Sequence, residues 1–179
     1  MLLMPLVDAT LFHYMHHMPF GNHTMLEIML QTARGLVYMH GCGILHLDIK
    51  PENIGISVDL QDAPQCRFLD FGSSVHIDRV QPGHTFHATP YFRAPELLLG
   101  CILPSSDVYS LGKVFDLFKR YVSVSLLSEN SVDWLDLLVL SMSDEASPNN
   151  RPSASLVMDC ISERGFQETA AASACDGLL

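Results

Sequence analysis

The sequence is poor in basic residues. Its 179 residues contain ten Lys and Arg against twenty Asp and Glu, for a formal net charge of -10. Nucleic-acid backbones and anionic membrane surfaces attract basic faces, so this balance argues against both as partners. The acidity weakly favours basic partners, although solubility alone is the simpler explanation. We therefore expect neither a nucleic-acid nor a membrane partner.

Paired cysteines and long apolar runs are also lacking. The five cysteines are scattered, odd in number and without a Cys-x-x-Cys spacing, which gives no sign of a disulfide framework or a zinc site. This usage predicts an intracellular location, cytoplasmic or nuclear. Residues 1–7 are apolar but have no basic leader and are too short for a signal peptide or a membrane span. A metal site at His13, His16 and His17 is disfavoured, because no acidic or thiol side chain accompanies them.

What the sequence does contain is a dense group of polar side chains in residues 44–53, Ile-Leu-His-Leu-Asp-Ile-Lys-Pro-Glu-Asn, followed by an Asp-Phe-Gly triplet. Asp48, Asn53 and Asp70 supply two acids and an amide, and Lys50 adds a cation. Such groups can bring the metal-bound phosphates of a nucleotide to a hydroxyl. One acid accepts the hydroxyl proton, while the amide and the other acid offer hard oxygen ligands to Mg2+. The sequence therefore predicts phosphoryl transfer.

The hydrophobic pattern predicts the elements around this group. A helix capped by Asn22 or Thr24 is expected to end at Gly41 or Gly43. The other expected elements are two short strands at 54–57 and 66–69, a mobile loop at 72–89, and helices that begin after Ser106, at Trp134 and at Ser153. In the helix after Ser106, the side chains of Val108, Leu111, Phe115 and Phe118 are expected to be buried.

Three triplets carry a family resemblance: His-Leu-Asp at 46–48, Asp-Phe-Gly at 70–72 and Ala-Pro-Glu at 94–96. In this order they resemble the catalytic loop, the metal loop and the end of the activation segment of protein kinases. One such triplet is common by chance, but three in register are a specific signal. The resemblance covers nearly all of the chain, but only the family's C-terminal lobe. It implies a mainly α-helical bundle with a small β-ribbon at the catalytic cleft, and with the N-terminal lobe absent.

The resemblance also implies how the chain is organised. Residues 1–166 correspond to the C-terminal lobe, with 1–7 as the last strand of the N-terminal lobe and the hinge. At the hinge, backbone groups from Met4 to Leu6 pair with adenine. We expect the tail at 167–179 to be flexible.

The chain has no glycine-rich loop, phosphate-pairing strand lysine or helix glutamate before the hinge. It is therefore expected to be either a fragment of a longer protein or a stand-alone lobe. A half-open site is wet, and electrostatic stabilisation of a phosphoryl group weakens in water. We predict that the isolated chain transfers phosphate negligibly.

The resemblance assigns a role to each member of the polar group. Asp48 accepts the proton of the attacking hydroxyl, and Lys50 neutralises charge on the transferred phosphoryl group. Asn53 and Asp70 bind Mg2+ and, with it, ATP. Thr89 ties the activation segment to the catalytic loop. This threonine and the Asp-x-Lys-x-x-Asn spacing are typical of serine/threonine kinases, so the expected acceptor is a Ser or Thr of a protein substrate.

Further residues are expected to support the site without touching the reactants. By resemblance, Asp107 anchors the catalytic loop from below, and Phe71 packs under the metal site. Glu96 and Arg151 are expected to form a buried bidentate salt bridge. His46 completes this structural set.

Two positions depart from the family pattern. Leu47 replaces the arginine that commonly clamps a phosphorylated activation loop, and a leucine offers no donor to phosphate. Switching by loop phosphorylation is therefore not expected. Gly55 stands where kinases usually place a large aliphatic side chain beneath adenine. The lost contact is expected to weaken nucleotide binding by up to about 1.5 to 3 kcal/mol.

Two functions of different classes stay open. The first is an ATP- and Mg2+-dependent serine/threonine protein kinase, with a regulatory protein as a further candidate partner. The second is a catalytically inactive kinase-like interaction module, either a pseudokinase or a truncated decoy. The complete set of acid, amide and lysine side chains favours the first, whereas the missing lobe, Leu47 and Gly55 favour the second. A small-molecule phosphotransferase is disfavoured, because it does not need the segment 89–96 that receives a protein substrate.

Overall fold

The computed structural model describes residues 6–17, 21–58, 64–81, 89–121 and 129–163. Its helices are α1 (Leu11–His17), α2 (Asn22–Gly41), α3 (Pro104–Tyr121) and α4 (Glu129–Met142), followed by a helix at 154–163. Its strands are β1 (Ala9–Thr10), β2 (Ile44–Leu45), β3 (Ile54–Val58), β4 (Pro64–Phe68) and β5 (Val75–His76). The prediction of a mainly helical fold with a small β-ribbon is confirmed.

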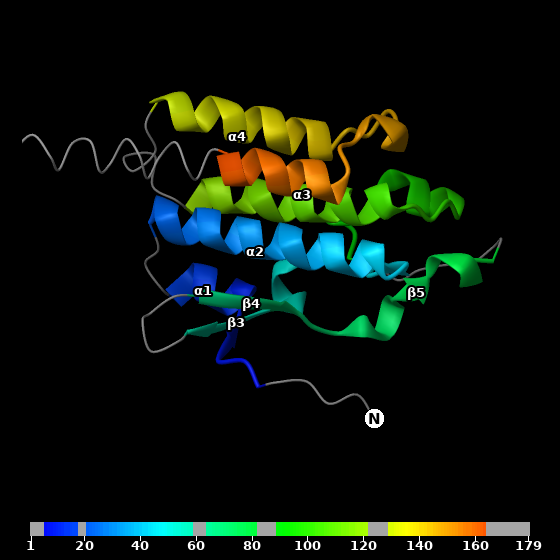
Figure 1. The fold of residues 1–179 in the computed structure, drawn as a ribbon, viewed down its shortest axis with the longest axis horizontal. Coiled ribbons are helices and arrows are strands. Elements are labelled where there is room, and N and C mark those ends of the chain that lie inside the picture. The colour runs from blue at the N-terminus through cyan, green and yellow to red at the C-terminus, as the bar shows by residue number, and fades with distance from the viewer. Residues whose placement is uncertain (1–5, 18–20, 59–63, 82–88, 122–128, 164–179) are drawn as a thin grey trace, which may run out of the picture.

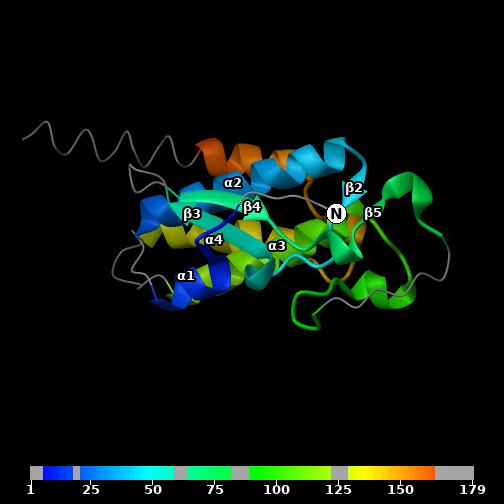
Figure 2. The same cartoon turned by 90° about the horizontal axis from the view of Figure 1, so that it is seen from below.

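The long helices lie side by side along the long axis of the molecule (Figure 1), and α3 contacts both α2 and α4. The pair β3 and β4 lies beyond α2, in front of the helices when the molecule is seen from below (Figure 2). Along α3 the apolar side chains of Leu111, Phe115 and Phe118 recur every three or four residues, and all three are fully buried. This spacing places them on one face of the helix, as the sequence predicted.

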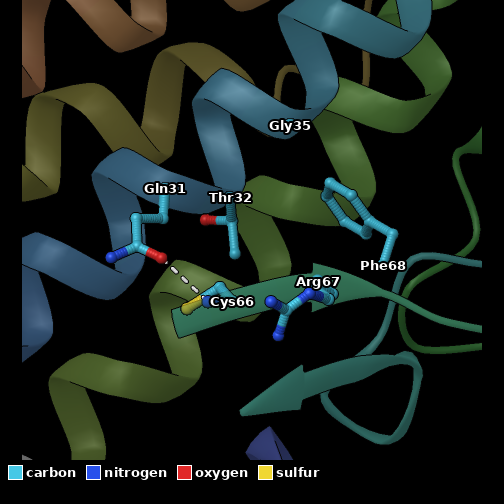
Figure 3. A pocket seen from close by; sticks show the side chains of 6 residues that line it. All are labelled: Gln31, Thr32, Gly35, Cys66, Arg67 and Phe68. Carbon is cyan, nitrogen blue, oxygen red and sulfur yellow. Dashed lines mark hydrogen bonds between the residues drawn. The ribbon is translucent and has the colours of Figure 1, made fainter. Parts of the chain in front are cut away.

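The larger sheet has the order β1–β3–β4, and both pairings are antiparallel. On β3 the side chains of Ile54 and Ile56 are buried in the main core, whereas Gly55 between them belongs to the opposite face, as strand alternation requires. The edge of β4 is covered by Gln31 of α2. Its amide oxygen accepts from Cys66 N at 2.8 Å (Figure 3), and its amide nitrogen donates to Pro64 O at 2.7 Å. A side-chain amide thus replaces a neighbouring strand, which blocks further pairing here.

The smaller sheet pairs β2 with β5 at the C-terminal end of α2. The segment 72–89, predicted as a mobile loop, contains β5 and parts of short 3-10 helices at Phe71–Ser73 and Ile77–Arg79. A two-residue strand is too short for a periodic pattern, so no pattern in the sequence predicted β5. Residues 82–88 lie outside the described part of the chain.

For α2, the predicted C-terminal end is confirmed and the predicted N-terminal cap is wrong. Gly21, in an extended conformation, precedes the helix without a side-chain cap, so the expected capping by Asn22 or Thr24 is wrong. The helix ends at Gly41 as predicted, and Gly43 has a φ of 71°, the left-handed conformation that glycine adopts at low cost. The expectations for the first strand and for the tail at 167–179 fall outside the described residues.

Candidate active site

Residues 44–53 form a loop that α3 holds from below. The Asp107 carboxylate is fully buried and accepts hydrogen bonds from the backbone N of His46 and of Leu47, each at 2.8 Å. His40 in the last turn of α2 places Nε2 3.0 Å from the same carboxylate. Backbone N–H groups buried without a partner are costly, so Asp107 stabilises the loop in this path.

His46 connects this loop to the strand end before Asp70. Its buried ring places Nε2 3.0 Å from Leu69 O and Nδ1 3.3 Å from Asp48 N. A carbonyl needs a donor and an amide N–H needs an acceptor, so the contacts fit a neutral ring with its proton on Nε2. The ring also packs beside Phe71, with 5.2 Å between the ring centroids. Both residues therefore lie where the loop and the Asp-Phe-Gly triplet meet.

Asp48 is the centre of a connected polar network. Its Oδ2 accepts from Lys50 Nζ at 2.8 Å and from Asn53 Nδ2 at 2.9 Å. Its Oδ1 faces Thr89, whose N and Oγ1 lie 3.4 and 3.5 Å away. Lys50 Nζ also donates to Thr89 Oγ1 at 3.0 Å. The fold thus gathers all four side chains, and among the described residues Oδ1 has only long contacts.

Asn53 is buried and turns its amide nitrogen toward Asp48. Nδ2 donates to the backbone O of Asp48, as well as to the carboxylate, at 2.9 Å in each case. Neither bond uses Oδ1, which keeps its lone pairs for another partner. The backbone O of Asn53 accepts from Leu69 N at 2.9 Å, next to Asp70. The pairing of β3 with β4 therefore brings the two expected metal ligands to neighbouring strand ends.

Asp70 is exposed and has a φ of 55°, a left-handed conformation rare for a residue other than glycine. Its Oδ1 accepts from Gly72 N at 3.1 Å, which closes the tight turn. Such backbone strain costs on the order of 1 to 3 kcal/mol and is concentrated at functional sites. Within the described ranges, no cluster of three or more His, Cys, Asp or Glu side chains could hold a metal by itself.

Glu96 and Arg151 form the expected bidentate pair, with Nη1–Oε1 at 2.5 Å and Nη2–Oε2 at 2.9 Å, and both are buried. Ser106 Oγ adds a hydrogen bond to Glu96 Oε1 at 2.7 Å. Burial alone would raise the pKa of the Glu96 carboxyl, but the hydrogen bonds from Arg151 and Ser106 outweigh it and hold the pKa below its usual value. The pair joins the end of the activation segment to the helical core.

The residues expected to contact adenine do not form a group comparable to the network around Asp48. Met4 lies outside the described residues, and the side chain of Leu6 is 92% exposed. Gly55 is the position whose missing side chain is expected to weaken nucleotide binding, and a Cβ there would lie 2.8 Å from Val7 Cγ1 and 3.1 Å from Leu69 Cδ1. These neighbours already fill the space of the missing side chain.

Two supporting residues were missed by the sequence reasoning. His40 bonds to Asp107, and Ser106 bonds to Glu96. A helical histidine and a serine at a helix start carry no signal of their own, because their partners are far away in the sequence. His40 is identified by the packing of α2 on α3, and Ser106 by the contact of α3 with the 3-10 helix Pro95–Leu99.

The fold and this network define the class of the protein, and the comparison with known families agrees. The model described as the protein kinase domain matches residues 1–159, so the chain belongs to the protein kinase family. No helix among the described residues is both long and apolar enough to cross a membrane.

Individual relatives cover shorter stretches. The chain is 37% identical over 86 residues to Protein kinase MCK1 of Saccharomyces cerevisiae, across 47% of this chain and 22% of that protein. It is 43% identical over 88 residues to the proto-oncogene serine/threonine-protein kinase mos of Sus scrofa (48% and 24%). It is 31% identical over 113 residues to Mitogen-activated protein kinase 12 of Homo sapiens (62% and 29%). In each case the match spans less than a third of the relative.

Proposed function

We propose that this chain provides the C-terminal lobe of a serine/threonine protein kinase, which transfers a phosphoryl group from ATP to a Ser or Thr of a protein substrate. The observation that carries the proposal is the network joining Asp48, Lys50, Asn53 and Thr89. The porcine relative is named a serine/threonine-protein kinase, which supports the same acceptor.

In this proposal Asp48 orients the acceptor hydroxyl and takes its proton. Its Oδ2 is already engaged by Lys50 and Asn53, which fix the carboxylate, whereas Oδ1 has contacts of 3.4 Å or longer. A substrate hydroxyl can therefore donate to Oδ1. Phosphoryl transfer depends more on positioning the nucleophile than on a strong base, so a fixed carboxylate suffices.

Lys50 is proposed to neutralise the transferred group. An ammonium has three donors, and two of them are directed to Asp48 and Thr89. The third can reach a phosphoryl oxygen while the other two hold the ammonium in place. A preorganised cation stabilises the charge that spreads over the phosphoryl oxygens in the transition state.

Asn53 and Asp70 fit the Mg2+ of the nucleotide. Asn53 offers Oδ1, and the exposed Asp70 offers the oxygen that does not bond to Gly72. Mg2+ commonly binds one or two protein oxygens and completes its shell with phosphate oxygens and water, so a pair of ligands is enough. When bound, the ion would neutralise charge on the phosphates of ATP.

The test is transfer of the labelled γ-phosphate of ATP to a pool of Ser- and Thr-containing peptides in the presence of Mg2+. It compares the 179-residue chain with the protein expressed from the complete reading frame that contains it. We expect negligible transfer by the chain alone, and clear transfer by the complete product that falls at least about 100-fold in Asp48→Asn. Glu52→Gln is the control, since exposed Glu52 lies outside the network.

Binding is measured separately. Mg2+ with a non-hydrolysable ATP analogue is titrated into the complete product and into its Asp70→Ala variant. Binding without any transfer to Ser or Thr would favour the inactive interaction module. Transfer that persists in Asp48→Asn would overturn the role proposed for Asp48.

A further inference from the structure

A second apolar cluster lies directly under the catalytic loop, separate from the main core. Its buried members are Leu45, Leu47, Ala94, Leu97, Ile102 and Tyr109. Val75 and Val80, which follow the Asp-Phe-Gly triplet, pack against this cluster. The side chain of Leu47 is only 1% exposed. The segment 74–80 therefore contributes two apolar side chains to the cluster that contains Leu47.

Backbone contacts hold the same segment. β5 pairs with β2, Ile77 N donates to Gly43 O at 2.8 Å, and Ser74 Oγ donates to His46 O at 3.3 Å. A Cβ on Gly43 would lie 2.9 Å from the ring of His76, so the two segments are in close contact. We use the name latch for two sets of contacts: those of Val75 and Val80 with the apolar cluster, and those of residues 74–80 with residues 43–46. Among the described residues, no ion pair joins the segment 74–80 to residues 43–47.

Leu47 gave no reason to expect switching by loop phosphorylation, but from this geometry we propose the opposite: Ser74 is an inhibitory phosphorylation site. The latch holds the segment 74–80 against the catalytic loop without charge, and a phosphate on Ser74 opens it. The regulatory meaning rests on the proposed kinase function. The opening itself does not, because it is a property of the fold.

The chemistry of Ser74 gives the sign of the effect. A serine/threonine kinase would replace the hydroxyl hydrogen of Ser74 with the γ-phosphoryl group of ATP, releasing ADP and a proton. Oγ then has no hydrogen to donate to His46 O, and phosphate oxygens meet a carbonyl oxygen. The next residue, Val75, packs against an apolar cluster where a charged group is poorly solvated. A phosphate at such a place disrupts by repulsion and desolvation.

Hydrogen exchange of the 179-residue chain, measured by mass spectrometry, tests whether a negative charge at position 74 opens the latch. We expect amides of 75–80 to exchange at least about tenfold faster in Ser74→Asp, and no more than about threefold faster in Ser74→Ala, which loses only the hydrogen bond. Ser73→Asp is the matched control and should leave these amides within about twofold of the parent. Incorporation of phosphoserine at position 74 should match Ser74→Asp.

The apolar part of the latch is tested with Val80→Ala, against Val157→Ala as the same change in the main core. Val80→Ala should speed amide exchange in 75–80 more than in the rest of the chain. Val157→Ala should not speed exchange in 75–80 more than elsewhere. Equal exchange in Ser74→Asp and Ser73→Asp, or slower exchange with phosphoserine, would overturn the proposal. Because exchange is read without any substrate, this result is independent of whether phosphoryl transfer occurs.

Discussion

The carboxylates beneath the catalytic loop and those at the cleft are used in different ways. Asp107 and Glu96 are buried, and both oxygens of each accept hydrogen bonds from the chain itself. At the candidate active site, within the described part of the chain, Asp48 Oδ1 has only long contacts, and exposed Asp70 accepts one hydrogen bond, from Gly72 N. The same functional group therefore builds the scaffold in one region and keeps free lone pairs in the other.

Hydrogen-bond saturation, and not residue type, therefore separates supporting acids from candidate reactive ones. A saturated buried carboxylate cannot take a new ligand without breaking an existing bond. Substitutions below the loop should therefore change stability, whereas substitutions at the cleft should change binding or transfer with little loss of stability.

The largest effect is expected for Arg151→Ala, which leaves Glu96 buried without its partner. Removing one member of a buried, hydrogen-bonded pair typically lowers the free energy of unfolding by about 3 to 5 kcal/mol. Urea denaturation measures this. The control is Arg120→Ala, since Arg120 is 64% exposed and pairs with Asp116 on the helix surface. That change should cost no more than about 1 kcal/mol.

The same pair predicts a pH dependence. Because the folded state lowers the pKa of Glu96 below its usual 4.5, the pair adds stability above that pH and loses it as pH falls through the lower folded value. The parent should therefore lose stability below pH 4.5 more steeply than Arg151→Met. Parallel curves of unfolding free energy against pH would contradict this.

Asp107→Ala is expected to have the next largest effect. It leaves the backbone N–H groups of His46 and Leu47 buried without an acceptor, at a cost of about 2 to 4 kcal/mol. The same denaturation experiment applies, with Asp116→Ala on the same helix as control. A loss below about 1 kcal/mol would mean that water or another group replaces the carboxylate, and that the loop is not held from below.

Asp70→Gly is expected to separate stability from binding at the cleft. Glycine adopts a φ of 55° without strain, so thermal unfolding should show a gain of up to about 1 kcal/mol. Binding of Mg2+ with an ATP analogue by the complete product should weaken, because a carboxylate ligand is lost. Asp78→Gly is the control, since Asp78 has no positive φ and should gain no stability. A stable, fully binding Asp70→Gly protein would refute the ligand role.

Features of the fold and of the candidate site could be predicted from the sequence where the residues that form them lie close together along the chain. The spacing of Asp48, Lys50 and Asn53 predicted a group of side chains that one short loop can gather, and hydrogen bonds join all three. The apolar period of α3 predicted its buried face. In both cases the decisive neighbours lie a few residues apart.

Features that depend on contacts between residues far apart in the chain could not be predicted from the sequence. His40 carries no mark of its contact with Asp107, and β5 is too short for a pattern. The surroundings of Gly55 could not be predicted for the same reason, because Val7 and Leu69 approach it only in the folded chain. Tertiary packing, and not local propensity, sets these contacts.

The smallest effect is expected for Gly55→Ala, on the cleft side of β3. The new methyl would meet the end of the Val7 side chain, which can shift, so the unfolding free energy should change by less than about 1 kcal/mol. Adding Val7→Ala should relieve part of the cost. Gly43→Ala, beneath the loop, should cost more, about 1 to 2 kcal/mol, because alanine is strained at a φ of 71° and also meets the His76 ring. Equal costs for Gly55→Ala and Gly43→Ala would show that the cleft is packed as tightly as the support below it.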